Sequence, residues 1–111
     1  MKKLVFSFVF LVSMHVNAWA GTDLTIDYID VKNGGNVSVY FTNGSDLLNS
    51  AGCNGHPETV SWEGTDDSAQ NYLSAILAAK MAGRPVEIIV DSVCLWGGSA
   101  GWPKLHTVRI K

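Results

Sequence analysis

The fold of this chain is decided by residues 66–94, which read DDSAQNYLSAILAAKMAGRPVEIIVDSVC. Asp67 is a favourable N-cap and Gln70 follows three residues later, so a helix is predicted to begin here. Gly83 suits the left-handed conformation that ends many helices. The nearly continuous apolar run at 86–90 then predicts a central strand. One helix followed by one buried strand is therefore the best-defined unit of the sequence.

The predicted helix has two distinct sides. Its apolar side is formed by four large residues, Tyr72, Leu73, Ile76 and Leu77. Another side is rich in alanine, at Ala75, Ala78, Ala79 and Ala82. Small residues allow a second backbone to approach closely, either from the protein's own sheet or from neighbouring helices in a homo-oligomer. Both alternatives stay open.

Strands are predicted on both sides of this helix. Segments 24–31 and 37–42 alternate in the manner of half-buried strands, and Asn33-Gly34-Gly35-Asn36 supplies a hairpin turn between them. A short third strand is predicted at 59–63, and a last one at 105–110. The element order is thus β-β-β-α-β-β.

This order predicts a mainly β domain with one helix, arranged as a small five-stranded OB-fold-like barrel. Closure into a barrel removes exposed edge strands, which favours this arrangement for a small exported chain. The alternative is an open α+β sheet carrying one helix.

The first twenty residues predict a secretory signal peptide, 1–20, that precedes a single domain at 21–111. Lys2 and Lys3 give a positive start, an apolar stretch follows, and Ala18-Trp19-Ala20 matches the small-x-small cleavage pattern. The apolar run is shorter than the ~20 residues needed to span a bilayer, so no membrane span is expected. We therefore expect a periplasmic or extracellular protein. The remaining domain is mildly acidic, which argues against a nucleic-acid partner.

Cys53 and Cys94 are the two cysteines of the chain. In an exported protein an even number of cysteines predicts disulfide pairing, and two cysteines allow one intramolecular bond. On the chain-entropy model such a bond is worth roughly 4 kcal/mol, a large share of the stability of a small domain.

The helix-to-strand segment resembles the B subunit of subtilase cytotoxin and, more loosely, other OB-fold B subunits of pentameric bacterial AB-type toxins. The residues that carry the resemblance are Tyr72-Leu73, Ala78-Ala79, Gly83-Arg84-Pro85-Val86-Glu87-Ile88 and Cys94, roughly a quarter of the chain. The resemblance implies a signal peptide, a disulfide and glycan binding.

The best candidate site is the loop 95–104, in which Trp96 and Trp102 flank a run of small residues. Indole faces are good platforms for sugar rings, and this loop would line the ligand surface of an OB barrel. The alternative is that both tryptophans fold back and cover the barrel end. Trp62 and Tyr40 are further candidate contacts, although Trp62 lies in a predicted strand and equally suits the core.

The sequence therefore predicts a small exported binding module that recognises a glycan or another host-surface ligand. The alternative is a periplasmic structural or inhibitory protein that acts through a protein partner. We expect no enzyme, because the G-x-S-x-G match at 97–101 lacks the large α/β sheet that a nucleophile elbow requires. No cofactor or metal is expected either, since His56 among scattered carboxylates is typical of a solvated loop.

Overall fold

The computed structural model describes residues 18–44, 52–56 and 58–111 of the chain. It is mainly β with one helix, as predicted, and its mixed six-stranded sheet has the order β1-β5-β6-β4-β3-β2. The elements are β1 (Ala18–Leu24), β2 (Ile26–Val31), β3 (Val37–Phe41), β4 (Thr59–Trp62), α1 (Ala69–Ala82), β5 (Val86–Leu95) and β6 (Trp102–Ile110).

The prediction of a closed five-stranded barrel is wrong, because an additional strand, β1, precedes the segment 24–31 that was predicted as the first strand. The first three residues of β1, 18–20, lie within the predicted signal peptide. Asp23 adopts a left-handed backbone conformation (φ 55°) just before the break between β1 and β2. The side chain of Asn43 fixes this bend: its Oδ1 accepts a hydrogen bond from Thr25 N (2.9 Å), and its Nδ2 donates one to Asp23 O (3.0 Å). β1 and β2 consequently become the two outer edges of the sheet, which stays open between them.

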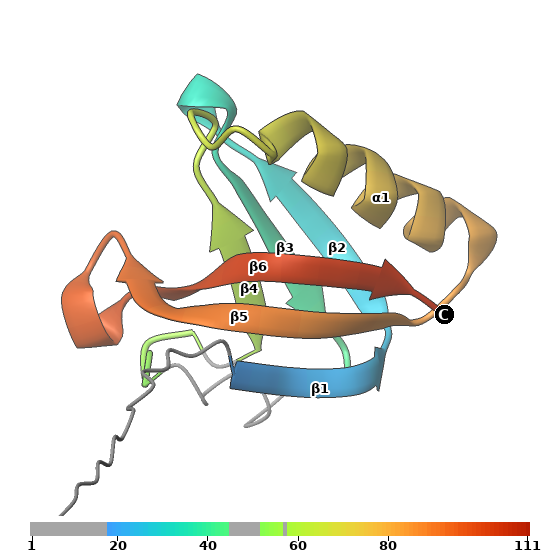
Figure 1. Cartoon of the computed structure of the whole chain (residues 1–111), viewed down its shortest axis with the longest axis horizontal. Helices are drawn as coiled ribbons and strands as arrows, with labels where there is room; N and C mark the ends of the chain where they lie inside the picture. Colours follow the sequence, from blue (N-terminus) through green and yellow to red (C-terminus); the bar gives the residue numbers. More distant parts are fainter. Residues whose placement is uncertain (1–17, 45–51, 57) are drawn as a thin grey trace, which may run out of the picture.

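The open sheet nevertheless curls around one hydrophobic core. Figure 1 shows β5 and β6 crossing in front of β2, β3 and β4 at a steep angle, with α1 covering one end. All six strands and the helix contribute buried side chains, among them Leu24, Ile26, Val39, Trp62, Ile76, Ile88 and Leu105. The inner surface of the curl is therefore filled by the core, and any ligand surface has to lie on its outside.

The helix begins and ends for local reasons. Ser68, not the predicted Asp67, is the N-cap residue, and Asp66 Oδ1 accepts a hydrogen bond from Ser68 N (2.8 Å). Gly83 ends the helix in the predicted left-handed conformation (φ 66°), and the N–H of Arg84 donates back to Ala79 O (2.9 Å). The capping-box prediction thus missed the start by one residue, whereas the helix stop is confirmed.

The apolar side of the helix is narrower than predicted. Ile76 and Ala79 are buried against the sheet, whereas Leu77 is 42% exposed. Ala79, which was predicted to lie on the alanine-rich side, is thus a core residue, and its small side chain lets the helix lie close to the sheet.

The last strand begins earlier than predicted, and this changes the position of Trp102. β6 starts at Trp102 and pairs antiparallel with β5 (Leu95↔Trp102), while Ser61↔Lys104 joins it in parallel to β4. Trp102 is therefore a strand residue with a fixed orientation, and the connection between the two strands is confined to 96–101.

Candidate functional site

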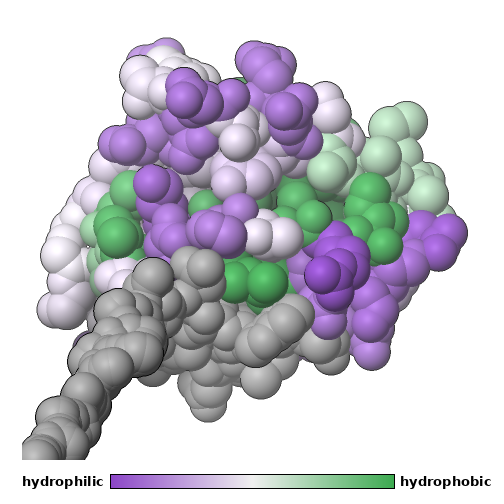
Figure 2. Space-filling view, viewed as in Figure 1, coloured by the Kyte–Doolittle hydropathy of each residue, from purple (hydrophilic) through white to green (hydrophobic). Residues whose placement is uncertain are grey.

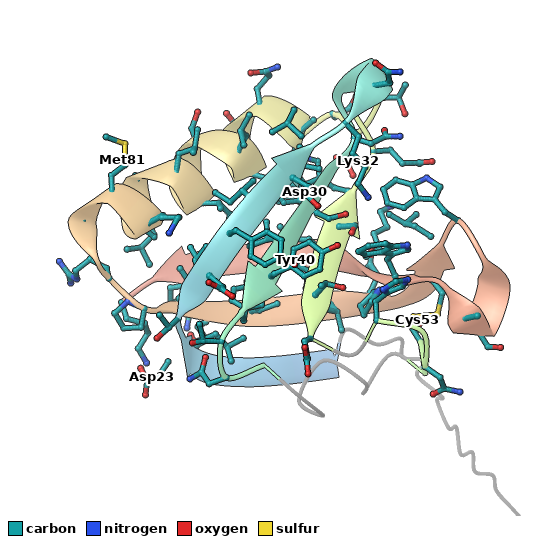
Figure 3. The ribbon with its side chains drawn as sticks, turned by 180° about the vertical axis from the view of Figure 1, so that it is seen from behind. Asp23, Asp30, Lys32, Tyr40, Cys53 and Met81 are labelled. Carbon is teal, nitrogen blue, oxygen red and sulfur yellow. A yellow bond between two sulfur atoms is a disulfide. The ribbon has the colours of Figure 1, made fainter. Side chains whose placement is uncertain are left out.

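The outer surface of β2 and β3 carries aromatic and polar side chains. Along β3, Val37, Val39 and Phe41 belong to the core, so Ser38 and Tyr40 project outward. Hairpin pairing places Tyr28 of β2 directly opposite Tyr40, and the two rings stack with centroids 4.2 Å apart and an interplanar angle of 13°. Figure 3 shows Tyr40 on this side of the molecule, with Asp30 and Lys32 nearby.

The stack continues into two tryptophans from the other half of the sheet. Tyr40 meets Trp102 edge-on, with centroids 6.0 Å apart, and Trp102 meets Trp96 at 6.2 Å. Four rings thus form an unbroken line of contacts from the edge strand β2 to the connection after β5. We call this surface the outer aromatic face and define it by Tyr28, Tyr40, Trp96 and Trp102.

Trp102 is held in this face by groups that cover its ring. The imidazole of His56 stacks on it with centroids 3.6 Å apart and an interplanar angle of 13°. The Lys32 ammonium lies 4.2 Å from the same ring centroid, and since the imidazole occupies one face, the ammonium lies over the other. Trp102 therefore offers little free ring surface to a ligand.

Lys32 is also bonded to the sheet beneath it. Its Nζ donates a hydrogen bond to Ser38 Oγ (3.0 Å), and Ser38 Oγ shares a buried hydrogen bond with Ser61 Oγ (2.8 Å). The same ammonium lies 5.2 Å from the Trp96 ring centroid. The Ser38 hydroxyl and two indoles hold the cation in one place, although Lys32 is an exposed residue directly after β2.

Trp96 differs from Trp102 in both backbone and exposure. Its φ of 60° lies in the left-handed region, which costs a bulky residue roughly 1–3 kcal/mol. Its side chain is nevertheless 40% exposed, so burial in the core does not offset this strain. Residues in strained backbone conformations cluster at functional sites.

The phenol of Tyr40 stays protonated at neutral pH. Burial and, to a smaller extent, the Asp30 carboxylate and Tyr28 raise the pKa of Tyr40 above its ordinary value of 10.0. Its hydroxyl can therefore both donate and accept hydrogen bonds beside the aromatic rings.

The predicted disulfide is confirmed, and it borders this face. Cys53 and Cys94 are joined, with Cα atoms 5.6 Å apart. Cys94 precedes Trp96 by two residues and Cys53 precedes His56 by three, so the bond brings the loop that carries His56 beside the tryptophans.

The structure brings together three of the four predicted ligand contacts, Tyr40, Trp96 and Trp102. Trp62 is completely buried on the inner side of the sheet, where its ring packs edge-on against Tyr72 at 5.3 Å. It therefore has no surface to offer a ligand and belongs to the core.

Sequence reasoning missed Tyr28, Lys32 and His56 as parts of this surface. Tyr28 could have been predicted from the hairpin register, because a turn at 33–36 sets it opposite Tyr40. His56 could have been predicted from the disulfide, which ties its loop to the residues before Trp96. Nothing local indicated that Lys32 lies against two indoles, because Trp102 belongs to β6 and Trp96 to the connection before it.

Comparisons with known proteins add no family or relative: no family model, curated protein or solved structure matches this chain. In the described parts of the chain, no helix is long and apolar enough to cross a membrane.

Proposed function

We propose that the protein is a small exported binding module that recognises a glycan through its outer aromatic face. The observation that carries this proposal is Trp96, whose ring is exposed although its backbone is strained. Sugars present apolar C–H faces that stack on such rings and hydroxyls that need polar partners. Asp30, Tyr40 and Lys32 supply donors and acceptors around the rings.

The strand order supports placing a ligand here. If β1 and β2 are counted as one strongly bent strand, the order becomes that of an OB-fold, with the helix between the third and fourth strands. OB-folds commonly bind oligosaccharides and oligonucleotides on the equivalent strands and loops. The mildly acidic domain favours the saccharide. The resemblance to toxin B subunits supports the same ligand class, and on the same basis we propose a homo-oligomer.

The contacts best placed to reach a ligand are Trp96 and Tyr28. Tyr28 is 48% exposed because it lies on the edge strand, and its ring is stacked on one side by Tyr40. Its other side is turned away from the rest of the sheet. Tyr40 and Trp102 are more covered and serve mainly to support these two rings.

A glycan array probed with the purified, labelled protein tests the proposal. Trp96→Asn and Tyr28→Ala should each weaken binding to any bound glycan about thirtyfold or more, the scale of aromatic hot spots. Asparagine is chosen because it tolerates the left-handed conformation, so Trp96→Asn should leave the free energy of unfolding nearly unchanged.

Met81→Ala is the matched control, because Met81 is 86% exposed on α1 and lies away from Tyr40 and Lys32 in Figure 3. This control should bind as the parent protein does. If no glycan is bound, or if Trp96→Asn and Tyr28→Ala bind normally, the proposal fails.

A second candidate function is binding to a protein partner in a structural or inhibitory role. It is favoured by the exposed apolar residues of α1, Leu77 and Met81. Figure 2 shows separate apolar areas on the face formed by β5, β6 and the C-terminal end of the helix, with polar residues between them. Under this alternative, Leu77→Ser combined with Met81→Ser abolishes partner binding, whereas Trp96→Asn has no effect on it.

A further inference from the structure

The Cys53–Cys94 disulfide lies outside the hydrophobic core of the sheet. Neither cysteine belongs to the core cluster that joins the strands to α1, although Cys53 is itself buried. Cys94 sits near the end of β5, close to the outer aromatic face, rather than at the central pairs of that strand such as Ile88↔Val108. Its position suggests a local role in addition to its general restraint on the unfolded chain.

Three successive residues after Cys53 contact the stretch of chain that follows Cys94. Asn54 N donates a hydrogen bond to Ser99 O (2.7 Å). Gly55 lies very close to Ala100, the residue after Ser99. A Cβ atom built on Gly55 would be 1.8 Å from Ala100 O. His56 then stacks on Trp102. Residues 53–56 thus lie flat against the 96–101 connection and the start of β6.

His56 is held from two directions. Its carbonyl oxygen accepts hydrogen bonds from the backbone N–H (3.3 Å) and the hydroxyl (3.0 Å) of Thr59, which begins β4. The disulfide fixes the chain three residues earlier. With both ends of this short segment held, the imidazole has little freedom to leave the Trp102 ring.

We propose that the Cys53–Cys94 disulfide assembles the outer aromatic face, with His56 as the positioning residue that transmits its effect to Trp102. Opening the bond releases the imidazole from the indole, loosens the 96–101 connection and displaces Trp96, while the core and the sheet stay folded. The inference deepens the proposed function. Its structural part stands without that function, and only the predicted effect on ligand binding rests on it.

The indole N–H resonances of Trp62, Trp96 and Trp102, three of the four tryptophans in the sequence, test this directly in a ¹⁵N correlation spectrum after assignment with single Trp→Phe variants. Trp62 reports on the core, and the other two report on the face. Reduction with a water-soluble phosphine adds two electrons and two protons to the disulfide to give two thiols, and the phosphine takes up oxygen from water.

On reduction, the resonances of Trp96 and Trp102 should shift and broaden, while that of Trp62 and the far-ultraviolet circular dichroism stay unchanged. Two results overturn the proposal. If all three indole signals collapse to unfolded positions, the bond holds the whole fold. If none moves, the face does not depend on it.

His56→Ala tests the positioning role in the oxidised protein, where global unfolding is not at issue. It should shift the Trp102 resonance more than the Trp96 resonance and leave Trp62 in place. His106→Ala is the matched control, because His106 is an exposed histidine on β6 whose ring bonds only its neighbour Thr107 among the described contacts. An unmoved Trp102 resonance in His56→Ala overturns the assignment.

These readouts need no ligand, so they separate this inference from the proposed function. A protein that binds no glycan but shows the Trp96 and Trp102 shifts refutes the function and leaves the disulfide's role standing. A protein that binds a glycan but shows no change in the Trp96 and Trp102 resonances on reduction keeps the function and refutes the inference.

Discussion

Trp62 and Trp102 lie on neighbouring strands of one sheet, and they are held in opposite ways. Trp62 points inward, is completely buried and meets Tyr72 of the helix. Trp102 points outward and is held between an imidazole and an ammonium group. The inner ring is fixed by exclusion from water, and the outer one by a few directional contacts with polar groups.

The difference shows how a small domain can order aromatic residues on its surface. Inside the curl, apolar neighbours from all strands fill the space around Trp62. Outside the curl, a few polar contacts hold Trp102 in place of apolar packing. They come from Lys32 and His56, and the disulfide holds the loop that carries His56. Inner and outer rings should therefore respond differently to substitution, to the removal of a charge and to pH.

The largest effect is expected at the inner ring. Trp62→Ala should lower the free energy of unfolding by about 3–5 kcal/mol, because it leaves a large cavity between the sheet and the helix. Urea denaturation followed by far-ultraviolet circular dichroism measures this. A loss below about 1 kcal/mol, the size typical of surface substitutions, would contradict the core placement.

Trp102→Ala should cost less, about 2 kcal/mol, because the ring is only partly buried and loses one stacking contact and one cation–π contact. The same denaturation experiment applies. A cost equal to that of Trp62→Ala would mean that the outer ring is as much a core residue as the inner one, and the comparison would break down.

Lys32→Met should lower the free energy of unfolding by about 0.5–1 kcal/mol, because it keeps the apolar stem and removes the ammonium from the indoles. A double-mutant cycle with Trp102→Ala isolates the interaction between the two side chains. A coupling free energy of zero would show that the cation contributes nothing to holding the outer ring.

The smallest effect is expected from the ionisation of Tyr40. Burial and the Asp30 carboxylate raise the pKa of this phenol above 10.0, so the folded protein holds the proton more tightly than the unfolded chain does. Its contribution to stability is fully present below about pH 10 and is lost as the pH rises through the folded-state pKa.

Denaturation at about pH 8 and pH 11 should therefore show a smaller loss of stability in Tyr40→Phe than in the parent protein. The pKa of Tyr72 is also raised, chiefly by burial, so part of the loss remains in this variant. An identical loss of stability in both proteins would show that the ionisation of Tyr40 does not contribute to it.

Features set by neighbouring residues could be predicted from the sequence, and those set by distant contacts could not. The helix stop at Gly83 and the hairpin turn at 33–36 depend on local backbone preferences, and both are observed. The break between β1 and β2 at Thr25 depends on Asn43, eighteen residues away, and no local sequence pattern predicts it.

The candidate site follows the same rule. Trp96 and Trp102 stand out in the sequence as two large aromatic residues around small ones, but their different orientations arise from strand pairing with β5. Lys32 reaches them only because β4 bridges β3 and β6. The sequence therefore indicated three of the four rings of the outer aromatic face and missed Tyr28. It also could not separate the supporting Trp102 from the exposed Trp96.

The place of β6 in the sheet has a consequence for how the chain is made. β6 lies between β5 and β4, and it is the link that joins β1 and β5 to the hairpin sheet of β2, β3 and β4. This link is the last of the described strands in chain order. A nascent chain that lacks residues 102–110 holds two separate half-sheets, so the domain cannot fold to completion until almost all of it has been translated.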